Sequence, residues 1–316
     1  IYGCSFLPYH DYGRGGRGWR DLWQDSLALL LTAPEQTRQD LLRYFAGVRT
    51  DGTNATIIGA KPKEFKADRN GIPRVWMDHG FWPMLTVELY LNETGDLDFL
   101  LEGQPYFRDT LAHQGEGSPL EALGAPCEGT VLEHLLIQNV TAFYDVGEHG
   151  FMRLRGADWN DGLDMAQARG ESVAFTAAYT GNFTALAKRL RDLAKTGRDG
   201  VEIPLPLQSL LEMDYQDAQE KPGKLMTYCR EMEAPAGKVT VSLEFLAVAM
   251  ERMAQELREN IRTTQWVGDG ADLHWFNSYY DNSGRPVEGG TDDPVRMMLT
   301  GQVFTILSGT ATEAQV

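Results

Sequence analysis

The sequence predicts a single all-α domain, and three features support this prediction. Apolar residues recur at helical spacing along most of the 316 residues. Runs of β-branched residues, which favour strands, are confined to residues 53–58 and 238–241. The length could hold one large domain or two ordinary ones. No short repeat is visible and no Gly/Ser/Pro-rich linker divides the chain, which favours one domain.

Seven segments combine helical spacing with residues that commonly begin or end helices. Pro34 sits where the first turn of a helix tolerates proline, because the N–H that it lacks has no helical partner there. Gly95 and Gly147 follow two of the segments and can adopt the conformation that closes a helix. Gly181 lies inside a long segment, which we expect it to divide into two helices. In chain order, the expected helices span residues 23–32, 35–48, 82–94, 130–146, 172–196 (divided near residues 180–182), 241–265 and 295–307.

The composition excludes two classes of partner. A formal net charge of -16 argues against nucleic acid, whose binding depends on Lys and Arg that neutralise phosphates. No run of about 18 apolar residues occurs, so no membrane partner is expected. A small anionic substrate remains compatible with the charge, because it needs only a local cluster of arginines.

The cysteines bear on cofactors and location. Cys4, Cys127 and Cys229 are far apart and lack the spacing of metal ligands, so we expect no metal site. A reduced, cytoplasmic environment is the simplest account of their use. The chain opens with Ile1 and ends at Val316, and we expect it to be a piece of a longer polypeptide.

Residues 155–164 form the most informative segment. Asp158 and Asp161 are three residues apart, Trp159 lies between them, and glycines flank the group. Sugar chemistry needs such a set: a carboxyl that protonates a leaving oxygen and an aromatic face for the C–H groups of a sugar ring. A surface turn rich in Asp, Asn and Gly is a second interpretation. A calcium loop is a third, although the ligand order of an EF-hand is not kept.

Residues 11–21 form a second unusual segment, with four glycines and three arginines. The glycines let the backbone approach a ligand, and the arginines supply forked donors that match phosphate or carboxylate. The segment lacks the Gly-Lys-Ser/Thr ending of a nucleotide P-loop, so ATP binding is not expected. A flexible linker with solvated arginines is the alternative.

Three motifs occur in one order and resemble the catalytic domain of glycoside hydrolase family 94, the inverting disaccharide and oligosaccharide phosphorylases. They are Gly-Trp-Arg-Asp-Leu-Trp-Gln-Asp at residues 18–25, Asp-His-Gly-Phe-Trp-Pro at residues 78–83, and Gly-Ala-Asp-Trp-Asn-Asp-Gly at residues 156–162. Residues 130–134 and 299–308 fit the same order. Within the family, Glu148-His149, Asp78-His79 and the Gly-Leu-Asp-Met ending after Asp161 are most similar to the 1,2-β-oligoglucan phosphorylases.

The resemblance implies an (α/α)6 toroid, in which loops at the ends of the inner helices form the site. Residues 1–316 would be part of one such catalytic domain, incomplete in this chain. By the same resemblance, we expect the N-terminal β-sandwich of the family to lie outside this sequence. The remaining phosphate ligands, a His and a Thr-Gly pair, follow the family segment that resembles residues 299–308, and we expect them to lie outside it as well.

The resemblance also implies a role for each matching residue. Asp161 would be the general acid, and because it must be protonated to act we expect it to be buried or to lie close to Asp158. Asp158 and Asp25 would hold backbone or arginine partners. The ligand-binding residues would be Trp159 beside the donor glucose, Arg20 and Asp21 on its hydroxyls, Asp78 as a further substrate contact, and Arg14 on the phosphate.

The implied reaction needs one catalytic carboxyl, because phosphate is the nucleophile. Phosphate is then a co-substrate and no other cofactor is expected. The expected partners are a β-linked gluco-oligosaccharide with β-1,2 links, phosphate, a second copy in a homodimer, and the remaining segments of the parent chain. An inverting hydrolase or transglycosylase on the same scaffold would need a second acid, for which Glu133 and Asp78 are the candidates. An inactive glucan-binding fragment is the third alternative.

Overall fold

The computed structural model describes residues 16–59, 61, 63–68, 74–108, 128–212, 217–233, 237–268, 273–288 and 296–316. Helices predominate among these residues, as the sequence predicts, and the strands form short sheets of two or three members. The chain forms two compact units. The first unit comprises residues 1–141, 202–210 and 226–240, and the second comprises residues 142–201, 211–225 and 241–316.

The described part of the first unit combines a three-stranded antiparallel sheet with helices. The sheet has the order β1–β2–β3, and Arg17 lies opposite Ile58 in its register. The elements are β1 (Gly16–Gly18), α1 (Trp19–Leu30), α2 (Pro34–Phe45), β2 (Ile57–Gly59), β3 (Phe65–Lys66), α3 (Phe81–Thr94), the 3-10 helix η1 (Leu97–Leu101), and the paired strands β4 (Gly103–Pro105) and β5 (Glu128–Thr130).

Aromatic side chains form the core of the first unit. Trp23 of α1 is fully buried, and its ring lies 5.0 Å from that of Phe45 and 5.4 Å from that of Tyr44, both on α2. The hydroxyl of Thr86 on α3 donates to the carbonyl oxygen of Trp23 at 3.1 Å. Burial of one such side chain stabilises the fold by about 1.5–3 kcal/mol. These contacts join α1, α2 and α3 and thereby fix the start of α1, where two of the candidate site residues lie.

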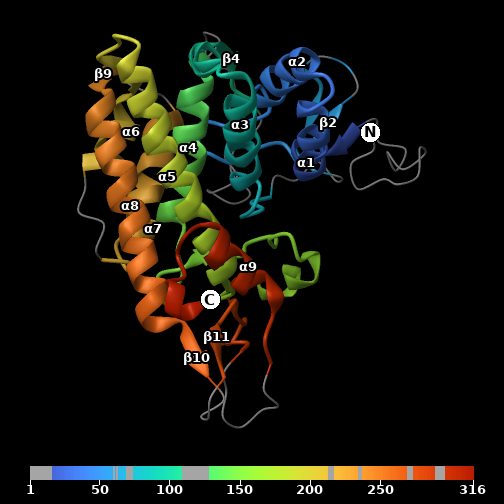
Figure 1. Cartoon of the computed structure of the whole chain (residues 1–316), viewed down its shortest axis with the longest axis vertical. Helices are drawn as coiled ribbons and strands as arrows, with labels where there is room; N and C mark the ends of the chain where they lie inside the picture. Colours follow the sequence, from blue (N-terminus) through green and yellow to red (C-terminus); the bar gives the residue numbers. More distant parts are fainter. Residues whose placement is uncertain are drawn as a thin grey trace. The chain divides into compact units, whose positions relative to one another are not determined.

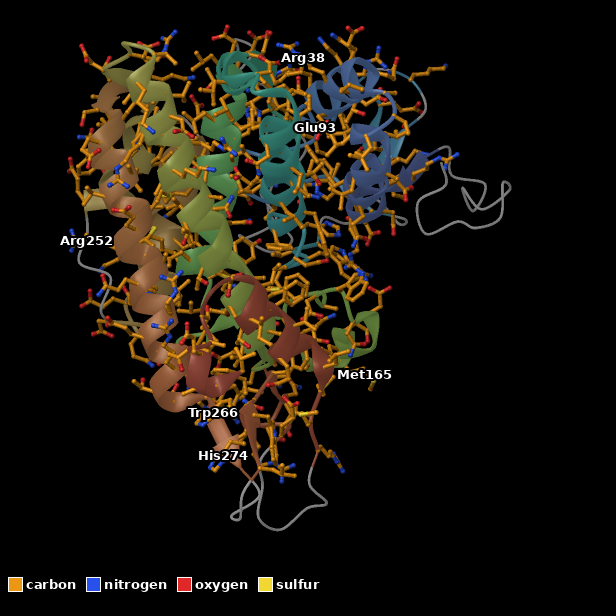
Figure 2. All side chains as sticks on the ribbon, viewed as in Figure 1. Arg38, Glu93, Met165, Arg252, Trp266 and His274 are labelled. Carbon is orange, nitrogen blue, oxygen red and sulfur yellow. The ribbon has the colours of Figure 1, made fainter. Side chains whose placement is uncertain are left out.

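The second unit is built on two long helices that pack side by side, α5 and α8 (Figure 1). A small antiparallel sheet has the order β12–β7–β6, and its middle strand β7 leads directly into α5. Trp266 on β10 stacks on His274 of the neighbouring strand β11, with ring centroids 5.9 Å apart (Figure 2). The elements are β6 (Met152–Arg153), the 3-10 helix η3 (Asp161–Ala166), β7 (Glu171–Ser172), α5 (Val173–Lys195), α8 (Leu243–Thr264), β10 (Trp266–Gly268), β11 (His274–Phe276), β12 (Tyr279–Tyr280), α9 (Leu299–Leu307) and η4 (Glu313–Gln315).

Five further elements contribute residues to both units. They are α4 (Val131–Tyr144), β8 (Gly200–Pro204), α6 (Leu205–Glu212), α7 (Lys221–Glu233) and β9 (Lys238–Ser242), of which β8 and β9 pair with each other. Helices α6 and α7 were not predicted, because α6 has only eight residues and α7 begins with Pro222 and Gly223, a pair that is typical of turns. The described helices include none that is long and apolar enough to cross a membrane.

The prediction that Gly181 divides a long helix is wrong. Helix α5 runs without interruption from Val173 to Lys195. A Cβ built on Gly181 would lie 3.5 Å from Ser308, so the glycine faces the residue that follows α9. One side of α5 is almost entirely buried, including Phe175, Phe183 and Leu190. Packing against α8 and α9 therefore outweighs the low helix propensity of one glycine, which is about 1 kcal/mol.

The expected ends of the other helices agree with the structure to different degrees. Pro34 opens α2, and Gly95 closes α3 with a left-handed φ of 70°, both as predicted. Gly147 is not a helix cap, because α4 ends at Tyr144. A Cβ on Gly147 would lie 2.4 Å from the carboxyl carbon of Glu171, so this glycine is needed for close approach. Helix α1 starts four residues earlier than expected, and residues 289–295, which include the predicted start of the last helix, lie outside the described residues.

Candidate functional site

In the first unit, Arg20 and Asp78 form a buried ion pair. Nε of Arg20 lies 2.9 Å from Oδ2 of Asp78, and a terminal nitrogen of Arg20 donates to Oδ1 at 3.1 Å. The indole N–H of Trp82 donates to Oδ2 of Asp78 at 2.8 Å. The guanidinium also lies 5.4 Å from the ring centroid of Trp76. A forked pair of this kind holds the arginine in one orientation. The structure therefore brings together two of the residues predicted to bind substrate.

His79, the residue that follows Asp78, is buried and binds Trp19 at the start of α1. The indole N–H of Trp19 donates to the carbonyl oxygen of His79 at 3.0 Å, and Nδ1 of His79 lies 3.1 Å from the side-chain amide nitrogen of Asn54. Burial lowers the pKa of His79 well below its usual value, and the charge of Arg20 lowers it further. The imidazole is therefore neutral at physiological pH, and the positive charge of this region lies on Arg20.

Asp21 lies in the first turn of α1 and is partly exposed. A Cβ built on Gly18 would lie 2.0 Å from Oδ2 of Asp21, so the carboxylate folds back over the residue that precedes the helix. Negative charge is favourable there, because the first backbone N–H groups of a helix point toward it. Arg14, the predicted phosphate ligand, lies outside the described residues.

The glycine-rich segment is partly a strand, which neither of the two interpretations anticipated. Gly16–Gly18 pairs with β2 as strand β1. A Cβ on Gly16 would lie 2.4 Å from Cγ2 of Ile57 and 2.6 Å from the carbonyl oxygen of Ile58. Close approach of two strands therefore accounts for this glycine. The described part of the segment is neither a loop nor a flexible linker.

In the second unit, the Asp-Trp-Asn-Asp motif forms a turn with one buried and one exposed carboxylate. Asp158 is completely buried, whereas Asn160 and Asp161 are exposed and Trp159 is 55% exposed. Asp158 accepts a hydrogen bond from the backbone N–H of Asn160 at 2.8 Å and another from the hydroxyl of Ser172 at 2.8 Å. We expected Asp161 to be buried, but the buried carboxylate is that of Asp158, which points toward Ser172 of β7.

The backbone that leads into this turn is constrained. Arg155 has a left-handed φ of 55°, which a residue with a side chain rarely adopts. Its Nε donates to Oδ2 of Asp145 at 2.9 Å, which holds the side chain in place. Burial raises the pKa of the Tyr279 hydroxyl, and the negative charge of nearby Asp158 raises it further. Asp158 therefore lies in a buried environment in which Tyr279 remains a neutral phenol.

The exposed side of the turn continues into η3. The side-chain oxygen of Asn160 accepts from the backbone N–H of Gly162 at 3.2 Å and so caps η3. Met165, near the end of η3, is 85% exposed (Figure 2). The turn therefore presents an indole, a carboxylate and a thioether to solvent. These are groups that suit a ligand with both C–H faces and hydroxyls.

The two carboxylates considered as a second catalytic acid are both held in buried pairs. Asp78 is bound by Arg20, as described above. Glu133 is 1% exposed, and its carboxylate accepts from the hydroxyl of Tyr106 at 2.8 Å and from Nζ of Lys238 at 2.7 Å. Burial raises the pKa of Glu133, and Lys238 opposes that effect. A base that activates water must reach that water beside the substrate, and both carboxylates are instead buried in ion pairs.

Two residues near the turn were not singled out from the sequence. Glu171 and Ser172 form β7, directly before α5, and both are completely buried. The signal for Ser172 is its position, because serine before a helix is a common N-cap, and here it accepts from the backbone N–H of Phe175 at 3.1 Å. The described residues include no group of three or more His, Cys, Asp or Glu side chains that could hold a metal ion.

Comparison with known proteins adds independent findings. Residues 5–202 match the family described as Glycosyl hydrolase 94 superfamily, catalytic domain. Solabiose phosphorylase of Paenibacillus borealis is 24% identical over 298 residues, which cover 94% of this chain and 28% of that protein. N,N'-diacetylchitobiose phosphorylase of Vibrio proteolyticus is 29% identical over 302 residues, which cover 84% of this chain and 34% of that protein.

A third relative is the cyclic beta-(1,2)-glucan synthase NdvB of Rhizobium meliloti. It is 27% identical over 177 residues, which cover 54% of this chain and 6% of that protein. The chain thus spans about a third or less of the length of each of these three relatives.

Proposed function

Because the chain belongs to the glycosyl hydrolase 94 superfamily, we propose that it carries the acid catalyst of an inverting glycoside phosphorylase. The reaction would convert a β-linked gluco-oligosaccharide and phosphate into α-glucose 1-phosphate and a chain shorter by one glucose. The observation that carries the proposal is the Asp158–Asp161 turn, which buries one carboxylate and exposes the other beside an exposed indole. Relatives named solabiose and N,N'-diacetylchitobiose phosphorylase support the reaction class.

In the proposed mechanism, Asp161 is the general acid. A phosphate oxygen attacks the anomeric carbon from the α face and forms a new C–O bond. The bond to the β-linked oxygen breaks, its electron pair stays on that oxygen, and the oxygen takes the proton of Asp161. The attacking phosphate is already an anion, so the step needs no second carboxylate to take a proton from the nucleophile, as the water of an inverting hydrolase does.

The binding roles follow the chemistry of each side chain. The apolar ring face of Trp159 suits the C–H face of a glucose ring, and Arg20 and Asp21 have a donor and an acceptor that suit sugar hydroxyls. Asp78 fixes the orientation of Arg20 through the forked ion pair. Its proposed contribution to substrate binding is made through Arg20. Arg14 would hold the phosphate, which acts as a co-substrate with no further cofactor.

Two observations favour phosphorolysis over hydrolysis. Asp78 and Glu133, the candidates for a base, both lie in buried ion pairs. The arginine-rich segment of an otherwise acidic chain would favour phosphate over water as the nucleophile, because arginine matches phosphate with two parallel hydrogen bonds.

The finer substrate proposal is a β-1,2-linked glucan. Its support is the relative named cyclic beta-(1,2)-glucan synthase, together with Glu148-His149 and Asp78-His79, the pairs that resemble the 1,2-β-oligoglucan phosphorylases. The other relatives are named for different sugars, so the linkage is a narrower proposal than the reaction.

We further propose that the domain is an (α/α)6 toroid completed by other segments of a longer polypeptide, which would add the remaining phosphate ligands. The short share of each relative that the chain spans supports this. Helix α9 leaves apolar side chains exposed that such a segment could cover: Leu299 at 71%, Val303 at 45%, Ile306 at 50% and Leu307 at 66%. A cytoplasmic location and a homodimer remain predictions.

The test is an assay of the full-length polypeptide with β-1,2-glucooligosaccharides, with and without inorganic phosphate. We expect glucose 1-phosphate that appears only when phosphate is present. Free glucose without phosphate would overturn phosphorolysis and would favour the hydrolase. Phosphate-dependent product from cellobiose but not from the β-1,2 substrate would support phosphorolysis and would overturn the proposed β-1,2 linkage.

A further inference from the structure

Strand β7 is two residues long, and each of its side chains anchors a different loop of the second unit. The hydroxyl of Ser172 donates to Oδ2 of Asp158 at 2.8 Å. The carboxylate of Glu171 accepts from the backbone N–H of His149 at 3.1 Å, from its ring nitrogen Nδ1 at 2.7 Å, and from the backbone N–H of Phe151 at 2.9 Å. One short strand thus holds both the turn with the acid and the loop of His149.

The position of β7 is itself fixed from several sides. It pairs with β6 on one edge and with β12 on the other, where Tyr279 lies opposite Ser172. Ser172 also caps α5, and the backbone N–H of Val173 donates to the carbonyl oxygen of Ser278 at 2.9 Å. Since α5 packs along α8, the hydroxyl of Ser172 is a rigid reference point within this unit.

Asp158 links the hydroxyl of Ser172 to the exposed side of the turn. Oδ2 of Asp158 binds the Ser172 hydroxyl, and Oδ1 accepts from the backbone N–H of Asn160, two residues along the chain. The side chain of Asn160 then repeats the pattern with the N–H of Gly162. These two successive turns fix the backbone on both sides of Trp159 and Asp161, so the directions of their side chains depend on Asp158.

We propose that Asp158, held by Ser172, is the positioning residue that sets the direction of Asp161 for proton transfer. This inference rests on the assignment of Asp161 as the general acid in the proposed function. A misplacement of about 1 Å at a reacting group can cost about 10²-fold in rate, because proton transfer needs hydrogen-bond geometry in the transition state. Loss of Asp158 should therefore lower kcat far more than it weakens the binding of sugar by Trp159, because contact with a ring face tolerates a displacement that proton transfer does not.

Hydrogen exchange of the peptide that covers residues 156–166 tests the anchoring without reference to activity. Asp158→Ala should raise the exchange of this peptide by about tenfold or more, because the Asn160 amide loses its acceptor. Asp158→Asn keeps one oxygen that can accept from Asn160 and should raise exchange less. Unchanged exchange in Asp158→Ala would overturn the proposal.

A matched control lies in the first unit. Asp51 is also completely buried, and its Oδ1 accepts from the backbone N–H of Thr53 at 3.0 Å and from the Thr53 hydroxyl at 2.6 Å. Asp51→Ala removes the same kind of hydrogen bonds from a different turn. It should leave the exchange of residues 156–166 unchanged and kcat within about threefold of the wild type.

Kinetics of the full-length polypeptide complete the test. We expect Asp158→Ala to lower kcat by about 10²-fold with KM within about threefold, and Asp158→Asn to recover about tenfold of that loss. A loss in Asp158→Ala no larger than in Asp51→Ala would reduce Asp158 to a stabilising residue and overturn the proposal.

The two hypotheses fail in distinguishable ways. Asp161→Asn should lower kcat by about 10³-fold without a change in the exchange of residues 156–166. An active Asp161→Asn variant would overturn the acid assignment in the proposed function. Raised exchange in Asp158→Ala together with wild-type kcat would overturn the positioning role alone.

Discussion

Asp78 in the first unit and Asp158 in the second are both completely buried, yet their partners differ in kind. Asp78 faces a guanidinium at 2.9 Å and the indole N–H of Trp82 at 2.8 Å. Asp158 accepts from a backbone N–H and a hydroxyl, both at 2.8 Å. The full opposite charge fixes the side chain of Arg20, which we propose binds substrate, whereas the neutral donors around Asp158 fix the course of the backbone. Removal of each aspartate should therefore have a different effect on catalysis and on the free energy of unfolding.

The largest expected effect is on catalysis, and it belongs to the turn of the second unit. Asp161→Asn preserves the size of the side chain but removes the proton that is transferred, so kcat should fall by about 10³-fold. Arg20→Lys, in the first unit, keeps the positive charge but loses the fork, so it should mainly raise KM. Release of glucose 1-phosphate measures both. If Arg20→Lys lowers kcat as much as it raises KM, then Arg20 also stabilises the transition state.

Removal of the two buried aspartates should affect stability unequally. Asp78→Ala leaves the guanidinium of Arg20 buried without its partner and should lower the free energy of unfolding by about 3–5 kcal/mol. Asp158→Ala leaves the backbone N–H of Asn160 and the hydroxyl of Ser172, both neutral donors, without this acceptor and should cost about 1–3 kcal/mol. Urea unfolding of each variant measures the difference. As a control, Arg20→Met combined with Asp78→Leu should recover part of the loss, and equal losses in the two single variants would contradict the comparison.

The first unit should also respond to acid pH through His134. Burial lowers the pKa of His134 to about 4 from its ordinary 6.5, with a small contribution from the charge of Lys238. Its ring stacks on Tyr106 at 4.0 Å, and Nδ1 lies 2.8 Å from the carbonyl oxygen of Thr130. Between pH 6.5 and about 4 the unfolded chain binds a proton that the folded chain does not. Stability should therefore fall by about 3 kcal/mol as the pH drops through this window.

Urea unfolding between pH 7 and pH 4 measures the effect. His134→Gln retains an N–H for the Thr130 carbonyl but does not titrate in this range, so its stability should change less over the same window. A wild type and a variant with the same pH dependence would assign the acid sensitivity to other groups, of which buried His79 in the same unit is one.

The smallest expected effect compares one glycine from each unit. Gly181→Ala places a methyl group in ordinary contact with Ser308 inside a continuous helix and should stabilise the protein by about 0.5–1 kcal/mol. Gly52 has a φ of 84°, and a Cβ there would lie 1.9 Å from the hydroxyl oxygen of Thr141. Gly52→Ala should therefore destabilise by about 1–3 kcal/mol. Thermal unfolding measures both, and a destabilising Gly181→Ala would argue that α5 is bent at this position.

The sequence by itself determined the local elements of this protein. The stripe of Leu246, Met250 and Leu257 predicts α8 because residues at that spacing fall on one face of a helix, and the structure buries them. Pro34 and Gly95 mark helix ends because their backbone preferences act without tertiary partners. The acidic turn was also visible, since an aromatic ring between two carboxylates is a local pattern.

Only the tertiary structure decided which carboxylate of that turn is buried. The exposure of Asp161 and the burial of Asp158 depend on Ser172, whose hydroxyl is 14 residues away in the chain. The pair of Arg20 and Asp78 joins positions 58 residues apart, and the continuity of α5 depends on packing with residues near 308. Spacing along a chain specifies periodicity and turn chemistry. Burial and charge pairing arise from contacts between distant segments, which form only when the chain folds.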